Sequence, residues 1–332
     1  MKLTGSLLNN LLVVLKRYSI YVAFILFFIY LSISSEHFLS LGNMLTILRQ
    51  VSVTGILAVG LTPILIQGDI DLSFGSLVTI CGLCVAMFQG ASTIEGSIMN
   101  FPVIVALILT VLVGVVGQAV NGLIITKLKV NPFILTLGTM TILKGFALVM
   151  SGGQSLSGLN PNFVLLSIVN FLGLPVIFWI FIIMAALSTI ILRKTTTGRH
   201  IYSIGGNVQA SFISGVPIDR RRITSYLIMG AYTAIAAIIL TSRLNSATPL
   251  AGDLYLMDVI AACVIGGTSL SGGKGGIGGT ILGVVFLGVI NNGLNLLGVP
   301  SAFQYVAKGF IIVIAVIIDA SKIKEEGRYI KQ

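Results

Sequence analysis

Charged residues are scarce in this sequence. Asp, Glu, Lys and Arg make up only 9% of its 332 residues, whereas soluble globular chains carry about 25%. Apolar residues make up 56%, and the mean hydropathy is +1.05. So few charges cannot cover the water-facing surface of a 35.1 kDa monomer, and disordered chains are polar and rich in charge. The composition therefore predicts an integral membrane protein.

Histidine and cysteine are also scarce, with two and three residues. The two histidines, His37 and His200, fall in loops on opposite sides of the expected topology, so they cannot share a catalytic site. Cys81 and Cys84 form a C-x-x-C inside an apolar run, and no further ligand nearby completes a metal site. We therefore predict no enzyme, no metal site and no disulfide framework, and we interpret these cysteines as helix-packing residues.

Two other ligand classes are also disfavoured. The run Thr268-Ser-Leu-Ser-Gly-Gly-Lys-Gly275 differs from a phosphate-binding loop, because Thr268 replaces its first glycine and Gly275 replaces its Mg²⁺-binding Ser or Thr. The net charge of +10 would suggest nucleic acid for a soluble protein. In a membrane protein, the same excess indicates basic cytoplasmic loops. We expect no bound cofactor and no nucleic acid.

Long apolar runs account for most of the chain. They do not alternate as β-barrel strands do, and their lengths suit membrane-spanning helices, which need about 20 residues. The sequence thus predicts an all-α protein with one transmembrane domain over residues 1–332. Its ten expected spans are roughly 19–34, 48–67, 74–90, 101–121, 131–151, 172–192, 223–242, 256–272, 277–297 and 303–320.

The distribution of basic residues orients these spans. With the N-terminus in the cytoplasm, 16 of the 20 Lys and Arg residues fall on the inner side, as the positive-inside bias requires. Both termini are then cytoplasmic, and residues 193–222 form the largest cytoplasmic loop. The inner basic residues are Lys2, Lys16, Arg17, Lys127, Lys129, Arg193, Lys194, Arg199, Arg220, Arg221, Arg222, Lys274, Lys322, Lys324, Arg328 and Lys331.

A weak internal repeat links the two halves. The segment Gly68–Gly75 aligns with Gly266–Gly273, and Asn121-Gly-Leu123 resembles Asn292-Gly-Leu294. Transporters are often built from duplicated halves. In the second half, the glycines at positions 275, 279 and 283 have the four-residue spacing that permits close helix approach.

Asp69 and Asp71 stand between two apolar runs, followed by Ser73. Carboxylates inside a membrane are costly and usually face a polar cavity or a break in a helix. One hypothesis is that these residues line a substrate pathway. The other is a short loop in which Asp71 caps the next helix; both can hold together.

Amide side chains recur in the apolar runs. Neutral donors and acceptors of this kind suit an uncharged, polyhydroxylated solute, although hydrogen bonds between helices are the alternative explanation for each residue. As a set, they predict a polar pathway, and its candidate residues are Asp69, Asp71, Ser73, Asn121, Asn291, Asn292 and Asn295, with Gln118 nearby.

The loop 193–222 contains a predicted short helix. Asn207 is a good N-cap and Gly215 suits a helix C-terminus, and an apolar stripe runs along Val208, Phe212 and Val216. This pattern predicts docking on another protein, with binding to membrane lipid as the alternative. The residues of the predicted docking helix are Asn207, Val208, Ala210, Phe212, Ser214 and Gly215.

Several longer motifs then identify a family. The chain resembles the permease subunits of ribose-type monosaccharide ABC importers along nearly its whole length. At Gln209 it departs from a common pattern that has Glu in the helix just described. The motifs are Gly68-Asp-Ile-Asp-Leu-Ser-Phe-Gly-Ser76, Asn121-Gly-Leu, Val130-Asn-Pro-Phe-Ile-Leu-Thr-Leu-Gly-Thr139, Gly198-Arg-His-Ile-Tyr-Ser-Ile-Gly-Gly-Asn207, Arg243-Leu-Asn-Ser-Ala and Asp258-Val-Ile-Ala-Ala-Cys-Val-Ile-Gly-Gly-Thr-Ser-Leu-Ser-Gly-Gly273.

The resemblance implies a full set of partners. It implies ten helices arranged as in the cobalamin-type (type II-like) importers, in the bacterial cytoplasmic (inner) membrane, with a second permease chain that is identical or a paralogue. It further implies cytoplasmic ATPase subunits, which use ATP and Mg²⁺, and an extracytoplasmic sugar-binding protein. Residues Asn207–Gly215 would then be the coupling helix that contacts the ATPase.

Other functions remain open on the sequence alone. The same machinery could carry a nucleoside, an inositol or a furanose-like signalling molecule instead of a ribose-like sugar. A different class is an ion-coupled secondary carrier, which would use intramembrane charges such as Asp69, Asp71, Lys144 and Lys308. A third is a membrane scaffold without transport.

Overall fold

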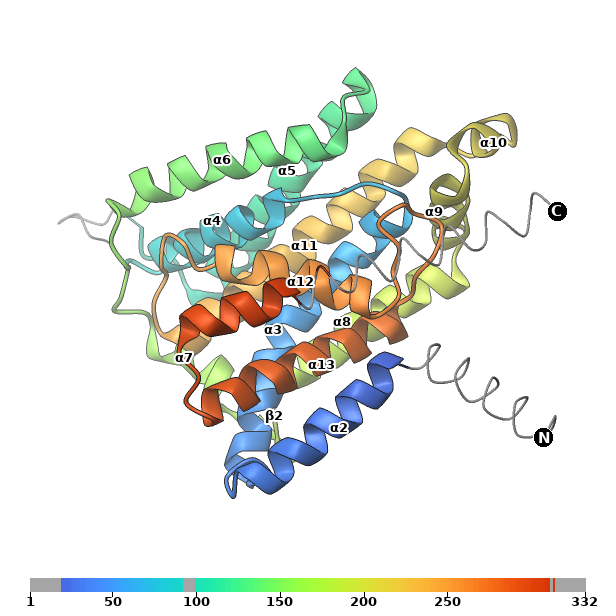
Figure 1. Cartoon of the computed structure of the whole chain (residues 1–332). Helices are drawn as coiled ribbons and strands as arrows, with labels where there is room; N and C mark the ends of the chain where they lie inside the picture. Colours follow the sequence, from blue (N-terminus) through green and yellow to red (C-terminus); the bar gives the residue numbers. More distant parts are fainter. Residues whose placement is uncertain (1–18, 92–98, 311–312, 314–332) are drawn as a thin grey trace, which may run out of the picture.

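The computed structural model describes residues 19–91, 99–310 and 313. It consists mainly of long helices that lie side by side, together with one short hairpin (Figure 1). In chain order, the elements are α2 (Ser19–Ser34), α3 (Leu41–Ile66), α4 (Ser73–Phe88), α5 (Val103–Leu128), α6 (Pro132–Ser151), α7 (Pro161–Ile168), β1 (Asn170–Phe171), β2 (Leu174–Pro175), α8 (Val176–Lys194), α9 (Thr196–Gly206), α10 (Val208–Ile213), α11 (Ile218–Leu244), α12 (Asp253–Ile265) and α13 (Ile277–Leu296).

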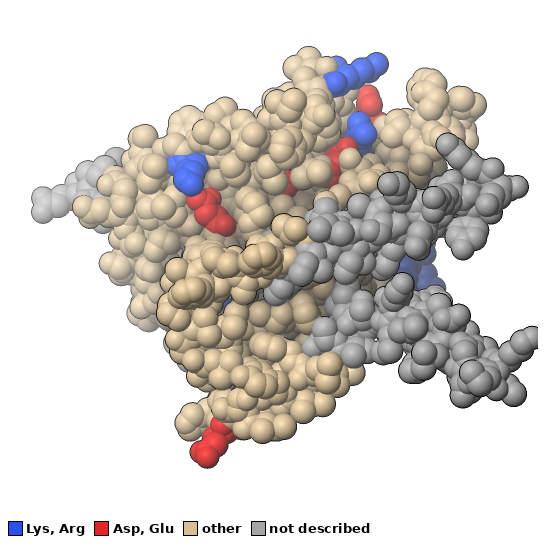
Figure 2. Space-filling model, in the orientation of Figure 1, with Lys and Arg blue, Asp and Glu red and all other residues tan. Residues whose placement is uncertain are grey.

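Six of these helices are long and apolar enough to cross a membrane: α3, α5, α6, α8, α11 and α13. The expected spans 19–34, 74–90 and 256–272 are also helical, as α2, α4 and α12, but with only 16, 16 and 13 residues. Residues 301–310 begin the expected last span, and most of its remainder lies outside the described residues, as do residues 1–18 and 321–332. Most of the face shown in Figure 2 is free of charged side chains, as a lipid environment requires.

Several boundaries differ from the prediction for local reasons. α3 begins at Leu41 because the Ser40 hydroxyl accepts a hydrogen bond from the Asn43 backbone nitrogen, 3.3 Å away, so the polar pair Arg49 and Gln50 lies inside the helix. The expected span 256–272 is wrong at its C-terminal end. There, α12 stops at Ile265 because Gly267 has a φ of +87°, a conformation that glycine adopts at little cost.

The core lies where α3 and α11 cross. Most of α3 is buried from Val51 to Ile66, and α11 packs against α3, α4 and α5. At the α5–α11 contact, the backbones approach so closely that a side chain on Gly114 would collide with Gly230. Because Gly122 packs against Tyr226 further along, the two helices are antiparallel, and the end of α5 lies beside the start of α11.

Glycines also bring α12 and α13 together. A side chain on Gly279 would collide with the backbone of Gly266, and one on Gly283 with that of Ala262. The predicted close helix approach is therefore confirmed for these two positions. Gly275 precedes α13 and packs against Thr268 in the preceding turn, so it is not part of the helix contact.

The internal repeat has a structural counterpart. After α3, the Asp69 nitrogen donates to the Ile64 carbonyl and Gly68 has a φ of +87°; after α12, the Thr268 nitrogen donates to the Cys263 carbonyl and Gly267 has the same φ. Both helices thus end in the same glycine-dependent turn. The equivalent glycines are 68 and 267, one residue beyond the alignment expected from sequence, and the two turns meet where the Gly273 nitrogen donates to the Ile66 carbonyl at 2.8 Å.

Candidate functional site

A buried polar cluster surrounds the connection between α3 and α4. The Asp71 carboxyl accepts hydrogen bonds from the Ser73 backbone nitrogen at 2.8 Å and from the Ser73 hydroxyl at 2.6 Å. Asp71 thus accepts from the first residue of α4, as expected, although the N-cap position itself is Leu72. Both side chains are fully buried, so this carboxyl depends on the protein for its hydrogen bonds.

Two amides on α5 complete the cluster. The Gln118 side chain donates to Asp71 at 2.6 Å, and that of Asn121 donates to the Ser73 hydroxyl at 2.8 Å. The Asn121 oxygen accepts from the Thr139 hydroxyl of α6, also at 2.8 Å. Residues on three helices and one connection are thus joined by hydrogen bonds, and the predicted pathway residues Asp71, Ser73 and Asn121 lie together.

Asp69 links this cluster to the start of α11. Its carboxyl accepts from the Gln67 amide at 2.9 Å and lies 3.3 Å from the Arg222 guanidinium. The carboxyl is 1% exposed, whereas the Arg222 side chain is 23% exposed. Burial raises the pKa of Asp69 to about 6, although the nearby Arg222 acts to lower it. We refer to Asp69, Asp71, Ser73, Gln118 and Asn121 as the aspartate cluster.

The other predicted pathway residues lie elsewhere, on α13. Asn292 is buried and exchanges two hydrogen bonds with Asn43, at 2.7 and 3.0 Å. Asn291 donates to Asp258 at 3.1 Å, and Asn295 accepts from Gln304 at 2.9 Å. The predicted set therefore divides into two groups. They lie at different places because the three asparagines are near the C-terminal end of α13, whereas the N-terminal end of α13 follows the turn that meets the connection between α3 and α4.

A cavity of about 230 Å³ opens beside Asn291 and Asn295. Asp258 is its central charged group, since its carboxyl accepts from both Asn291 and Lys308, the latter at 2.9 Å. We call this space the amide cavity. It is lined by Gln50, Thr54, Arg243, Leu254, Tyr255, Asp258, Leu287, Gly288, Asn291, Asn295, Gln304, Tyr305 and Lys308.

Most of the residues around this cavity were not identified from the sequence. Asp258 and Lys308 are charged residues within two of the expected spans, where such residues are rare and signal function. They are 50 positions apart, and their pairing follows only from the fold. Lys144, another intramembrane cation, pairs with Asp253 at the start of α12. The four charges that a secondary carrier was expected to use therefore fall in three separate places.

The predicted docking helix is present as α10. The Asn207 side chain accepts from the Ala210 nitrogen at 2.9 Å, and Gly215 has a φ of +75°, so the predicted N-cap and C-terminal glycine are both confirmed. The preceding residues, expected only as a polar loop, form α9. Figure 1 shows α10 at one extremity of the molecule.

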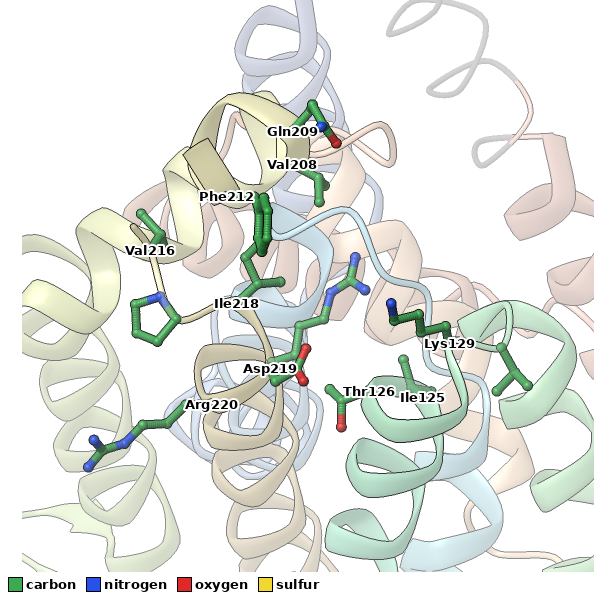
Figure 3. Close-up of a pocket in the computed structure, with 13 residues that line it drawn as sticks. Ile125, Thr126, Lys129, Val208, Gln209, Phe212, Val216, Ile218, Asp219 and Arg220 are labelled. Atoms are coloured by element: carbon green, nitrogen blue, oxygen red, sulfur yellow. The ribbon is translucent and has the colours of Figure 1, made fainter. Parts of the chain in front are cut away.

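The apolar residues Val208 and Phe212 of α10 border a groove of about 750 Å³. The predicted stripe was wrong at Val216, because α10 ends at Ile213 and Val216 follows it. Phe212 and Val208 point into this groove toward the end of α5, whereas Arg220 points away from it (Figure 3). Phe212 is 67% exposed and Val208 is 43% exposed. The stripe is therefore accessible from outside the chain. Its surroundings are basic, with Lys129 and Arg222 among the residues that line the groove.

Comparison with known proteins identifies the family. The family described as "Branched-chain amino acid transport system / permease component" matches residues 43–316. The chain belongs to this permease family. No solved structure gives a significant match.

Relatives of the permease cover nearly its whole length. It is 42% identical over 312 residues to the ribose import permease protein RbsC of Bacillus subtilis, with 93% of this chain and 94% of the relative covered. It is 36% identical to the L-arabinose transport system permease protein AraH of Escherichia coli (93% and 92% covered) and 34% identical to the D-allose transport system permease protein AlsC of the same organism (92% and 91% covered). The permease is thus a multi-pass protein of the inner membrane, related to sugar permeases.

Proposed function

We propose that this permease is the membrane-spanning subunit of an ATP-driven ABC importer for a monosaccharide, with a ribose-like sugar as its substrate. The observation that carries the proposal is the 42% identity to a ribose import permease over 93% of the chain. The names of the arabinose and allose relatives support the wider class of monosaccharides. The chain has no catalytic role in this proposal, because separate ATPase subunits hydrolyse ATP with Mg²⁺.

The proposed assembly follows from the same family. It has ten spans per chain in a cobalamin-importer-like arrangement, both termini in the cytoplasm, and two permease chains around one pathway. An extracytoplasmic binding protein delivers the sugar. The clustering of Lys127 and Lys129, at the end of α5, beside Arg220–Arg222, at the start of α11, supports this orientation, since basic residues collect on the cytoplasmic side.

We propose that α10 couples the permease to the ATPase. Its apolar residues Val208 and Phe212 are exposed at the basic end of the molecule, and an apolar helix face that meets water is favoured to bind a partner. Movement of α10 would reach the aspartate cluster through α11, because Arg222 near the start of α11 contacts Asp69. In this proposal, the cluster responds to the ATPase and borders the sugar pathway.

Co-purification tests the partner. The wild type and a Val208→Ser/Phe212→Ser variant are purified under mild detergent, beside Phe171→Ser as a matched control. Phe171 is 59% exposed, in β1. We expect an ATPase subunit with the wild type and the control, and its loss from the α10 variant. A wild type that purifies without an ATPase and transports in vesicles without ATP would establish the secondary carrier instead.

A further inference from the structure

The amide cavity lies at the end of the molecule opposite α10. Arg243, one of its lining residues, is the penultimate residue of α11. Ile218, the first residue of the same helix, borders the α10 groove. The two residues are 25 positions apart, which corresponds to about 37 Å at 1.5 Å per residue. Under the proposed topology, the cavity therefore opens on the side from which the sugar arrives.

Two residues that line the cavity each carry a buried side-chain oxygen that has no hydrogen-bond partner within the described chain. These oxygens are the side-chain carbonyl oxygens of Gln50 and Asn291. The orientation of the Asn291 amide follows from its neighbour, because its nitrogen donates to the Asp258 carboxylate, which cannot donate in return. The Asn291 oxygen is therefore an acceptor left open beside the cavity, and buried acceptors normally have a partner.

The cations of the cavity restrict which ligand can supply that partner. Lys308 pairs with Asp258, and Arg243 adds a second positive charge to the lining. A carboxylate ligand has only acceptor oxygens, so it would leave the two carbonyl oxygens unpartnered, and a phosphate ligand keeps at most one or two donating hydroxyls beside its acceptor oxygens. A cationic ligand could donate to them but would be repelled by Lys308 and Arg243. A neutral hydroxyl group both donates and accepts, and so satisfies carbonyls and cations together.

The size and lining of the cavity point to a single sugar ring. The volume of about 230 Å³ lies below the range of about 300–1,000 Å³ for drug-sized ligands. It corresponds to the liquid volume of roughly eight waters, at about 30 Å³ each. Tyr255 and Tyr305 add aromatic surface to the polar lining, against which the apolar face of a sugar ring can pack.

We infer that the amide cavity is a binding subsite of the permease itself for one neutral monosaccharide, occupied after the sugar leaves its binding protein. The inference rests on the proposed function and adds a location and a selection rule to it. Asn291 and Gln50 accept from sugar hydroxyls, while Lys308 and Arg243 donate to them. Selection among solutes is then shared between the binding protein and the permease. The permease rejects anions and solutes larger than one ring.

Cysteine protection tests this inference on the full chain. Thr54 lines the cavity one helical turn from Gln50, and Thr54→Cys places a thiol there with little change in volume. The native cysteines, Cys81, Cys84 and Cys263, are all buried. Proteoliposomes are labelled with a membrane-impermeant thiol reagent, without binding protein, in the presence of D-ribose or inorganic phosphate. We expect ribose to slow labelling several-fold and phosphate to leave the rate unchanged.

Matched variants separate the cavity from general effects. Asn162 is exposed at the start of α7 and is not among the residues that line the cavity, so Asn162→Cys should label at the same rate with and without ribose. Asn291→Leu in the Thr54→Cys background should abolish the protection, whereas Asn162→Leu should preserve it. If Thr54→Cys does not fold, Leu254→Cys replaces it, because Leu254 lines the same cavity and is 58% exposed.

Uptake in the same vesicles, with ATPase and binding protein added, distinguishes the two proposals. ATP-driven ribose uptake with no protection at saturating ribose would overturn the cavity site and leave the importer standing. Protection by phosphate and not by ribose would also overturn it. Absence of ATP-driven uptake by the wild-type assembly would overturn the importer itself.

Discussion

The Arg222 guanidinium lies 3.3 Å from the Asp69 carboxylate and joins the start of α11 to the connection between α3 and α4. Because Asp69 is almost fully buried, removal of the guanidinium leaves a buried acceptor without its charged partner. We predict that Arg222→Gln lowers the free energy of unfolding by about 1–3 kcal/mol. Thermal unfolding in detergent measures this loss. In a double-mutant cycle, Asp69→Asn should recover part of it, and simple additivity would contradict the contact.

The same pair predicts a pH dependence. The pKa of Asp69 in the folded protein, about 6, lies above its ordinary value of 3.8 because the carboxyl is buried. The stabilisation due to this shift is complete below about pH 4 and is lost as the pH rises through about 6. At pH 8 the carboxylate is charged and needs Arg222, whereas at pH 5 it is largely neutral. The Arg222→Gln deficit in melting temperature should therefore be larger at pH 8 than at pH 5; an equal deficit would refute this explanation.

Gln118 provides a test of the aspartate cluster. Gln118→Leu removes the 2.6 Å hydrogen bond to Asp71, so we expect a loss of about 1–3 kcal/mol and reduced uptake. Gln89→Leu is the matched control, because the Gln89 amide donates to the Val85 carbonyl, one turn earlier in the same helix. Melting temperatures and ribose uptake are measured for both. If both variants lower the melting temperature and the uptake equally, the aspartate cluster contributes no more than an ordinary buried hydrogen bond.

Two neighbouring glycines provide a sharper comparison at the same end of the molecule. A side chain on Gly205 would collide with the Ile66 carbonyl and the Gly273 nitrogen, whereas one on Gly206 would meet nothing within 4 Å among the described residues. We predict that Gly205→Ala destabilises by at least about 1–3 kcal/mol, as overpacking does. Gly206→Ala should be neutral or slightly stabilising, since alanine favours helices. The yield and melting temperature of the two variants measure this difference. Equal values for Gly205→Ala and Gly206→Ala would contradict the packing of α9 against the two turns.

The features predicted most accurately from the sequence are helix ends that depend on neighbouring residues. Asn207 and Gly215 bound α10 as expected, because capping depends on residues within one turn. The end of α12 was placed wrongly because the expected span was drawn to the length of a membrane crossing, while the φ of Gly267 decides where the helix stops. Likewise, α3 begins seven residues before the expected span 48–67, because Ser40 caps the helix at an earlier position.

The candidate sites were harder to predict because they depend on distant pairings. The contact of Asp71 with Ser73 at the start of α4 could be predicted from sequence, since only Leu72 separates the two residues. Their contacts with Gln118 and Asn121 cross about 47 positions, and only the packing of α4 on α5 brings them together. Similarly, the amide cavity depends on Asp258 meeting Lys308, which no local pattern encodes.

Reconstitution tests the central claim most directly. The permease is placed in proteoliposomes with its ATPase and the sugar-binding protein, and uptake of labelled D-ribose is measured with and without ATP. We predict uptake only with ATP, and its loss in the Val208→Ser/Phe212→Ser variant, whose exposed stripe on α10 can no longer bind the ATPase. Uptake that proceeds equally without ATP, or with the variant, would contradict the proposed importer.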